Sequence, residues 1–222
     1  MNNSVTNTAR LLWAGLRALL VLTLVTGVIY PLAVTGIAQG LFHDQANGSE
    51  IKADGKVVGS SLIGQAYNLP LKKGQQTPEP DLKWFQGRPQ NGLGANTVNV
   101  QYKLILSGAT NRSADNKDLI AWVTAAKAAV IKDNSVGSYI VKPADVPADA
   151  VTSSGSGLDP DISRQYADLQ VHRIAEKNGL SVAEVDKLVE DHTEGRTLGF
   201  MGEPRVNVLE LNLALKDLVA KG

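Results

Sequence analysis

One long uncharged segment constrains this chain more than any other feature. Residues 18–42 contain no Asp, Glu, Lys, Arg or His. Because an α-helix rises about 1.5 Å per residue, a helix over this stretch is longer than the hydrocarbon core of a bilayer, which is about 30 Å thick. The segment therefore predicts a single transmembrane helix over residues 18–42, with some tilt.

The charges beside this segment predict its orientation. Arg10 and Arg17 lie just before it, and residues 1–42 contain no acidic side chain. Cytoplasmic flanks of membrane helices carry an excess of Lys and Arg. We therefore expect residues 1–17 in the cytoplasm and residues 43–222 outside the membrane, as one exported domain of a single-pass protein.

A cleaved secretory signal is the alternative interpretation of the same segment. Two arginines, an apolar stretch and the small-x-small triplet at residues 36–38 satisfy that pattern too. The apolar stretch is, however, longer than the roughly 7–15 residues of a signal core. This length favours a retained membrane anchor.

Small residues within the segment suggest where another helix could pack. Gly36 and Gly40 have the G-x-x-x-G spacing that lets two membrane helices approach closely, and Gly27 adds a third small position. Pro31 lacks a backbone N–H and should loosen or kink the helix. Gly27, Gly36 and Gly40 are therefore candidate positions for contact with other membrane subunits.

The composition of the exported part excludes several kinds of protein. Residues 43–222 carry 20 Lys and Arg against 22 Asp and Glu, so no strongly basic surface favours nucleic acid. The chain has no cysteine, which excludes disulfides, thiolate metal sites and a cysteine nucleophile. An exported domain without disulfides must rely on its hydrophobic core, and this suits the bacterial cell envelope. We therefore expect the protein to reside in the plasma membrane of a bacterial cell.

The exported part begins with short strand signals and loops. Residues 56–59 and 61–63 are β-type runs between Gly, Asn and Asp residues, and residues 138–141 are a further strand candidate. Residues 69–89 contain four prolines and no apolar period, so they predict a loop.

Helices dominate the second half of the exported part. Ser181 and Glu184 have the spacing of a capping box, and Asn207 and Glu210 repeat it near the end of the chain. With the strands above, the pattern predicts an α+β domain with a few strands and about four helices. The helices are expected over about residues 116–132, over 163–177, after Ser181 and after Asn207.

Sequence signals of catalysis are weak. His43, His172 and His192 are far apart and form no i, i+4 pair, so we expect no metal site. Ser153, Ser154 and Ser156 fall in a Ser/Gly cluster, but no strand–Gly-x-Ser-x-Gly–helix pattern surrounds them. A turn is the better interpretation, and an exported serine hydrolase is the less favoured alternative.

Two arginines could lie at a protein interface. Arg88 lies in a Gly-Arg-Pro triplet, and Arg196 follows the sequence His-Thr-Glu-Gly. Either guanidinium could pair with carboxylates of a partner subunit. An internal ion pair is an equally good interpretation of each.

Five motifs, taken in order, resemble one known family. Together with the N-terminal membrane helix, they are similar to the C subunits of Kdp-type potassium-transporting P-type ATPases (KdpC). Each motif is short, but their order and the length of chain they cover are specific. The motifs are Gln45–Ser49, Gly59–Gln65, Gly87–Pro89, Val151–Pro160 and Gly202–Leu215.

The resemblance implies a non-catalytic accessory subunit of an ATP-driven, high-affinity potassium importer. The implied partners are a channel-like potassium-binding subunit, a P-type ATPase subunit and a small hydrophobic subunit. The implied role is to stabilise the complex and, as a catalytic chaperone, to raise the affinity of the ATPase subunit for ATP. No tightly bound cofactor is expected, although ATP could be contacted through the ATPase subunit. The positions implied in that contact are Ser153, Ser154, Gly155, Ser156, Gly157 and Gln170.

Direct contact with ATP conflicts with the predicted orientation. ATP is cytoplasmic, whereas the positive-inside rule places residues 151–170 outside the membrane. We therefore expect the exported domain to lie over the potassium entrance of the channel-like subunit and to affect ATP affinity allosterically. A membrane-anchored binding or sensor module of the envelope, unrelated to transport, is the remaining alternative.

Overall fold

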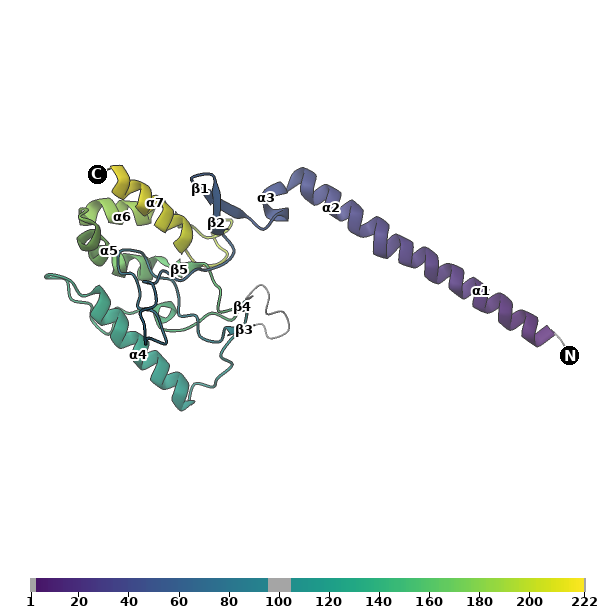
Figure 1. Ribbon diagram of the computed structural model, residues 1–222, viewed down its shortest axis with the longest axis horizontal. Helices are drawn as coiled ribbons and strands as arrows, with labels where there is room; N and C mark the ends of the chain where they lie inside the picture. The colour runs from purple at the N-terminus through teal and green to yellow at the C-terminus, as the bar shows by residue number, and fades with distance from the viewer. Residues whose placement is uncertain (1–2, 96–104, 222) are drawn as a thin grey trace. The chain divides into compact units, whose positions relative to one another are not determined.

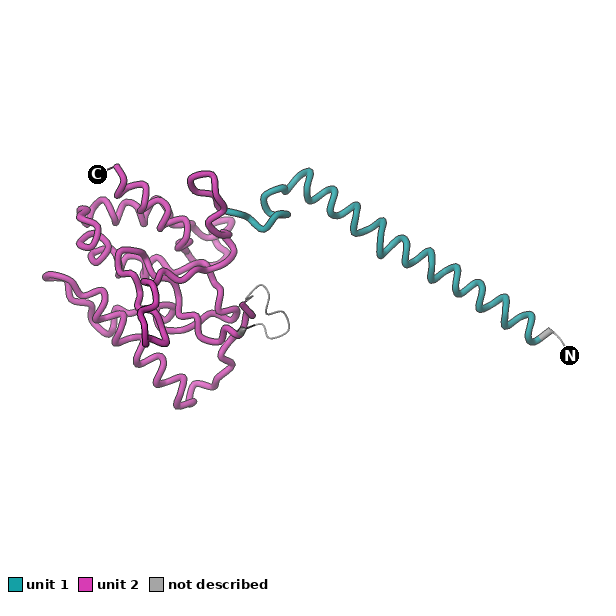
Figure 2. Tube along the Cα trace, in the orientation of Figure 1, with its two compact units in different colours: residues 1–50 teal, residues 51–222 magenta. Residues whose placement is uncertain are grey.

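The computed structural model describes residues 3–95 and 105–221 of the chain. The chain is divided into two compact units, Met1–Glu50 and Ile51–Gly222 (Figure 2). One long helix makes up most of the first unit, whereas the second combines helices with short strands (Figure 1). The predicted α+β class is confirmed.

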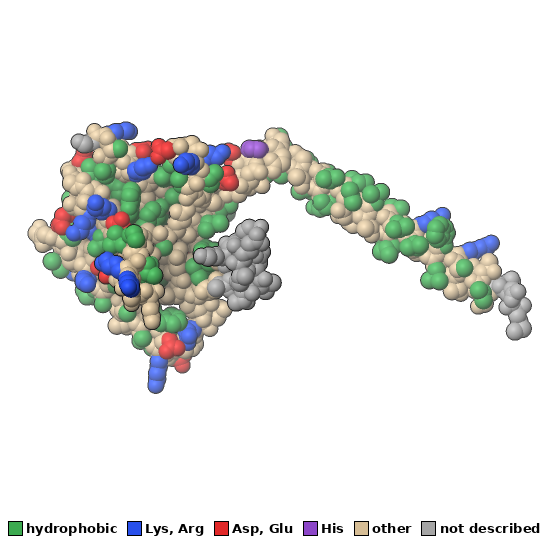
Figure 3. All heavy atoms as spheres, in the orientation of Figure 1, with side chains coloured by type: hydrophobic (Ala, Val, Ile, Leu, Met, Phe, Trp, Pro, Cys, Tyr) green, Lys and Arg blue, Asp and Glu red, His purple; other side chains and the backbone are tan. Residues whose placement is uncertain are grey.

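The first unit is built on a continuous helical segment with a change of hydrogen-bond pattern near its middle. The 38-residue stretch Ser4–Leu41 is long enough and apolar enough to cross a membrane. Its large apolar side chains are exposed, as contact with lipid requires (Figure 3). The segment consists of α1 (Asn3–Leu24), the π-helical turn η1 (Val25–Ile29) and α2 (Tyr30–Leu41), and the four-residue helix α3 (His43–Ala46) follows it.

The π-helical turn ends two residues before Pro31. Pro31 cannot donate a backbone hydrogen bond, so a regular α-helical pattern is interrupted at this point. The N–H of Tyr30 instead donates to the carbonyl of Val25, five residues back. The expected loosening of the helix at Pro31 takes the form of this wider turn.

In the described part of the second unit, the four longer helices begin close to the predicted positions, and the sequence predicts caps for two of them, at Ser181 and Asn207. Asn116 and Ser163 accept hydrogen bonds from the first turns of α4 and α5. Ser181 and Glu184 form both hydrogen bonds of a capping box. The bounds are α4 Lys117–Asn134, α5 Arg164–Asn178, α6 Val182–Asp191 and α7 Val208–Lys221, and the 3₁₀ turn η2 covers Ala148–Ala150.

The described strands are short and pair locally, apart from one antiparallel sheet. That sheet has the order β5-β7-β6, and Val206 in its central strand lies opposite both Ile162 and Thr193. Two further pairs are β1-β2 and β3-β4. The bounds are β1 Glu50–Ala53, β2 Lys56–Ser60, β3 Gly94–Ala95, β4 Ile105–Leu106, β5 Asp161–Ser163, β6 Thr193–Glu194 and β7 Arg205–Asn207.

Two of the strand predictions are wrong. Residues 61–63 form a turn after β2, since the Ser60 hydroxyl accepts a hydrogen bond from the N–H of Leu62. Residues 138–141 belong to a tight turn, in which Val136 and Tyr139 exchange backbone hydrogen bonds. Gly137 allows this turn because its φ is +55°. The strand at 56–59 and the absence of helices and strands from residues 69–89 are as predicted.

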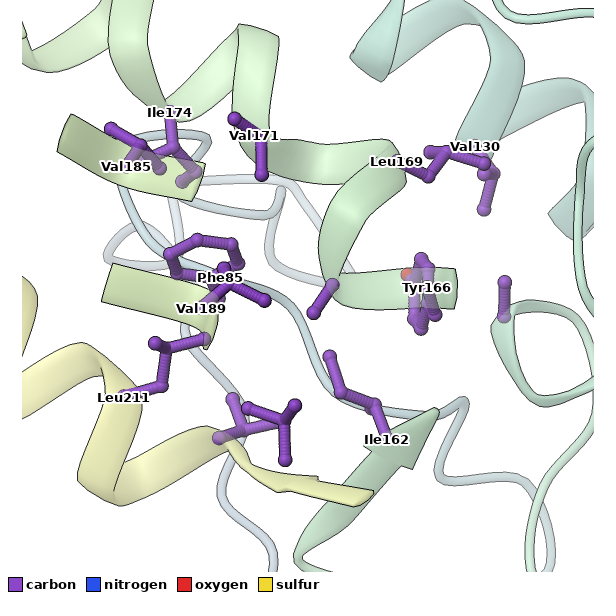
Figure 4. Close-up of a cluster of buried hydrophobic side chains, with 14 of the residues drawn as sticks. Phe85, Val130, Ile162, Tyr166, Leu169, Val171, Ile174, Val185, Val189 and Leu211 are labelled. Carbon is purple, nitrogen blue, oxygen red and sulfur yellow. The ribbon is translucent and has the colours of Figure 1, made fainter. Parts of the chain in front are cut away.

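The hydrophobic core surrounds a residue from a segment without regular secondary structure. Phe85 is fully buried and lies among side chains of α5, α6 and α7 (Figure 4). The sheet contributes Ile162 and Val206 to the same cluster. The loop that carries Phe85 therefore passes through the interior, where its backbone polar groups need partners.

Candidate functional site

Four segments that are distant in the sequence meet at one place, which we call the loop junction. It comprises residues 60–65, 87–89, 151–161 and 205–208. The N–H of Gly64 donates to the carbonyl of Leu158 at 2.8 Å. The side chain of Asn207 donates to the carbonyl of Ser61 at 2.8 Å. Parts of four of the five motifs that resemble the KdpC family therefore lie together.

A glycine permits the closest approach in the loop junction. A Cβ atom added to Gly64 would lie 2.4 Å from the carbonyl oxygen of Asp159. Gly157 has a φ of +68°, and a Cβ there would lie 2.7 Å from a methyl of Leu93. Only glycine fits these two positions without displacing a neighbour. Gly155 is different, because a Cβ there would meet nothing within 4 Å.

The serine hydroxyls of the junction stabilise a turn. The Ser156 hydroxyl accepts a hydrogen bond from the N–H of Leu158 at 3.1 Å. The Ser154 hydroxyl lies 3.3 Å from that of Ser156 and accepts from the N–H of Asp159 at 3.4 Å. Gly155 and Ser156 are exposed, Ser154 is half-buried and Gly157 is buried. The hydrogen bonds agree with the turn interpretation.

The three histidines contact residues outside the serine turn. His172 stacks on Tyr139 with ring centroids 3.9 Å apart, and Nδ1 of His192 lies 2.8 Å from the carbonyl of Leu188. His43 contacts Asn47 in the first unit. None of these contacts brings a histidine to a serine hydroxyl. Among residues 3–95 and 105–221, no group of three or more His, Asp or Glu side chains could hold a metal ion.

Both candidate interface arginines form ion pairs within the chain. Arg88 lies 3.0 Å from Asp159, and both side chains are mostly shielded from solvent. Arg88 thereby joins two segments of the loop junction. Arg196 pairs with Glu203 at 2.9 Å on the surface. The internal interpretation holds for both residues, and a role at a subunit interface stays a prediction.

Gln170 lies in the core. Its side chain is fully buried on α5. The amide oxygen accepts from the N–H of Gln86 at 2.7 Å and from Arg173 at 2.7 Å. The amide nitrogen donates to the carbonyl of Gln86 at 3.1 Å. The two functional groups of this amide are therefore occupied by the protein, and they contact Gln86 rather than the serine turn.

Gln170 belongs to a larger set of polar side chains that hold residues 82–86, which we call the core segment. Asn212 on α7 donates to the carbonyl of Phe85 at 3.0 Å and accepts from its N–H at 2.8 Å. Arg173 donates to the carbonyls of Leu82 and Trp84. Helix side chains thus supply the hydrogen bonds that a neighbouring strand would supply in a sheet.

Arg173 is the charged member of this network. It is 1% exposed, and no carboxylate among the described residues lies within ion-pair distance of it. Burial lowers the pKa of its guanidinium to about 10. Burial also raises the pKa of the Tyr166 phenol, earlier on α5, to about 12. Carbonyl and amide oxygens, including Asn134 Oδ1 at 2.8 Å, compensate the buried cation.

The core segment and the loop junction are continuous. Gln86 is held by Gln170, and Arg88, two residues later, is held by Asp159. A cavity of about 340 Å³ beside this connection is lined by Gln86, Arg88 and Tyr166, among others. Residues 86–88 therefore connect the core network to the loop junction along the backbone.

Sequence reasoning missed this network, although one signal for it exists. Asn212 stands between the apolar residues Leu211 and Leu215 of α7, and Gln170 and Arg173 are three residues apart on one face of α5. Polar side chains on a face that must be buried need partners inside the protein. The sequence does not identify the core segment as that partner.

The candidate glycines of the first unit lie on an open helix surface. A Cβ added to Gly36 or Gly40 would meet nothing within 4 Å, and one added to Gly27 would meet only a methyl of Thr23 at 3.9 Å. These positions leave room for a close neighbour. Contact with another helix there stays a prediction.

Comparisons with known proteins give a consistent result. The family model described as "KdpC: K+-transporting ATPase, c chain" matches residues 12–217. A protein of Streptomyces avermitilis, named "Potassium-transporting ATPase KdpC subunit", is 84% identical over 220 residues, which are 99% of each chain. Proteins of the same name are 74% identical in Streptomyces coelicolor, over 100% of this chain and 99% of that one, and 46% identical in Gemmatimonas aurantiaca, over 92% and 94%.

Proposed function

Because the chain belongs to the KdpC family, the c chains of K+-transporting ATPases, we propose that its folded domain acts on the other subunits of such a complex from outside the membrane. The chain is an accessory subunit in potassium import and is not catalytic by itself. The family assignment removes the grounds for the sensor-module and serine-hydrolase alternatives.

The proposed partners are the channel-like potassium-binding subunit, the P-type ATPase subunit and the small hydrophobic subunit. The helix Ser4–Leu41 supports a place in the bilayer. Arg10 and Arg17 near its start support a cytoplasmic N-terminus and an external domain. In this orientation the domain stabilises the complex at the potassium entrance.

The burial of Gln170 carries the proposal that any effect on ATP affinity is indirect. Its amide bonds Gln86 and Arg173 inside the core, so contact with ATP would require the core to open and those bonds to break. We infer that Gln170 acts by keeping residues 86–88, and with them the loop junction, in position. The domain then raises ATP affinity by binding one transport state better than another.

Direct contact between ATP and Ser153–Gly157 is the competing mechanism. One observation favours this mechanism, because Gly155 and Ser156 are exposed. It requires the loop to be on the cytoplasmic side of the membrane. The two mechanisms therefore differ in a property that chemical labelling can measure.

The test combines activity with labelling in a reconstituted complex. ATP-driven potassium uptake and the KM for ATP are measured with and without this chain. Gly155→Cys provides a unique thiol in a chain without cysteine, at a position where a Cβ meets no neighbour. We expect a lower KM with the chain present, and reaction of the thiol with an impermeant maleimide only from outside.

Three results would separate the alternatives. Labelling from the cytoplasmic side would overturn the proposed orientation and restore direct ATP contact. Unchanged potassium uptake and unchanged KM without the chain would overturn the accessory function itself. Ser153→Ala and Ser156→Ala should leave uptake unchanged, and its loss would indicate a chemical role for these hydroxyls.

A further inference from the structure

A turn in the second unit exposes three large apolar side chains to solvent. Leu198 is 78% exposed, Phe200 is 72% exposed and Met201 is 45% exposed. We call residues 198–201 the apolar tip. Scattered apolar residues at a surface are ordinary, but three within four residues form a patch, and such patches mark interaction sites.

The backbone of the apolar tip is held in a defined shape. Thr197 and Met201 exchange backbone hydrogen bonds of 2.9 and 3.0 Å. Leu198 has a φ of +54°, which is uncommon for a residue with a branched side chain, and Gly199 follows with +81°. An unfavourable backbone conformation that is fixed by its surroundings and that exposes a leucine points to a function for that leucine.

Charges of both signs surround the base of the tip. Arg196 pairs with Glu203 at 2.9 Å. Arg205 pairs with Glu194 at 2.6 Å. The tip therefore has an apolar centre and a polar rim of balanced charge, the arrangement found at protein–protein interfaces.

The same charges argue against a lipid surface as the binding partner. Segments that insert into a membrane surface carry mainly Lys and Arg beside their apolar residues, because bacterial headgroups are often anionic. Glu194 and Glu203 balance Arg205 and Arg196, so these pairs give the base of the tip no net positive charge that would attract such headgroups. A protein surface can instead match both charge signs while it covers the apolar centre.

We propose that the apolar tip is a docking element that inserts Leu198 and Phe200 into an apolar pocket on another subunit of the K+-transporting ATPase complex. This inference rests on the proposed assembly of the chain with other subunits. Aromatic and large aliphatic side chains at the centre of an interface carry most of its binding free energy. Arg196 then lies at the rim of this interface and contributes mainly to the choice of partner.

The first experiment measures assembly. The full-length double variant Leu198→Asn/Phe200→Ser is compared with Ile140→Ser, a change at a residue of the same unit that is 66% exposed. Asn is chosen because it tolerates positive φ. We expect the tip variant to bind the remaining subunits at least roughly tenfold more weakly than the wild type, and Ile140→Ser to bind normally. Equal binding by the wild type and both variants would overturn the proposal.

The second experiment identifies what covers the tip and does not depend on the folding of the double variant. A benzophenone amino acid replaces Phe200 in the full chain, and the assembled complex is irradiated. A crosslink to another subunit of the complex supports the proposal, and a crosslink only to a second copy of this chain would overturn it. Lipid adducts alone, or no adduct, would overturn it.

The two proposals can fail separately. If omission of the chain lowers potassium uptake but the tip variant assembles normally and the benzophenone finds no protein, only the docking inference is wrong. If omission of the chain has no effect on uptake or on KM, the proposed function is wrong, whatever the crosslinking shows.

Discussion

The side-chain amide of Gln170 pairs with the backbone of Gln86 through two hydrogen bonds, of 2.7 and 3.1 Å. A carboxamide has a donor and an acceptor in the arrangement of a peptide group, so it can replace one residue of a neighbouring strand. Asn212 does the same for Phe85. Two helix side chains thus stabilise a chain segment that belongs to no sheet.

This pairing makes Gln170→Ala destabilising. The substitution leaves the N–H and carbonyl of Gln86 without these partners and removes an acceptor of Arg173, so we expect a loss of about 3 kcal/mol in the free energy of unfolding. Urea titration of the full chain in detergent, followed by tryptophan fluorescence, measures it. Gln165→Ala, an exposed position on the same helix, is the control and should cost under about 0.5 kcal/mol. Equal costs would contradict the structural role of the amide.

The close approach at Gly64 predicts a contrast between two glycines of the loop junction. Gly64→Ala places a methyl 2.4 Å from a backbone oxygen of Asp159, so the loops must separate. We expect a cost of about 2 kcal/mol, within the range for overpacking. Gly155→Ala meets no neighbour and should be close to neutral. Thermal unfolding of both variants measures the difference, and a neutral Gly64→Ala would show that the two segments are not packed as described.

The ion pair between Arg88 and Asp159 should be measurable by a double-mutant cycle. Its side chains are 24% and 31% exposed, whereas those of Lys72 and Glu79 in a surface pair are 66% and 55% exposed. We expect a coupling free energy of about 1 kcal/mol for the shielded pair and close to zero for the exposed one. A coupling free energy near zero for Arg88 and Asp159 would show that this ion pair does not hold the two segments of the loop junction together.

The burial of the Tyr166 phenol predicts a loss of folding stability at alkaline pH. Burial raises the pKa of its phenol from 10.0 to about 12, so the folded state retains a proton that the unfolded state releases. This contribution is complete below about pH 10 and is lost as the pH rises through about 12. Arg173 acts in the opposite sense, because the pKa of its guanidinium is lowered to about 10. Comparison with Tyr166→Phe at each pH isolates the tyrosine.

We expect the wild type to lose stability relative to Tyr166→Phe as the pH rises above about 10, and the difference to be constant below it. Urea titrations across this range measure the difference. Parallel curves at all pH values would show that the phenol is not buried in the folded state.

Local signals predicted much of the helical structure. The capping box of Ser181 and Glu184 is formed, and the helix after Asn207 begins as expected, because caps depend on a few neighbouring residues. The strand expected at residues 138–141 failed because Gly137 supports a tight turn, which a short apolar run does not reveal. Short strands depend on distant partners and are the least determined by local sequence.

The candidate site was only partly predictable. The Ser/Gly turn and both arginines could be identified as separate features, but the contact of Gly64 with Asp159 joins residues far apart in the chain. The sequence also offered no reason to place Gln170 beside Gln86 rather than at the surface. Such contacts are properties of the tertiary structure, and helix periodicity indicates only that a face is buried.

The pairing of Asn212 with Phe85 has a consequence for the order in which the protein is made. These residues are 127 positions apart, and Asn212 lies on α7. The interior backbone near Phe85 lacks this partner until α7 has reached the same side of the membrane, so the domain cannot complete its folding before residue 212 has been made and delivered there. Packing of α7 is therefore a late step of biogenesis, and a chain that stops before residue 212 should be recognised and degraded as unfolded protein.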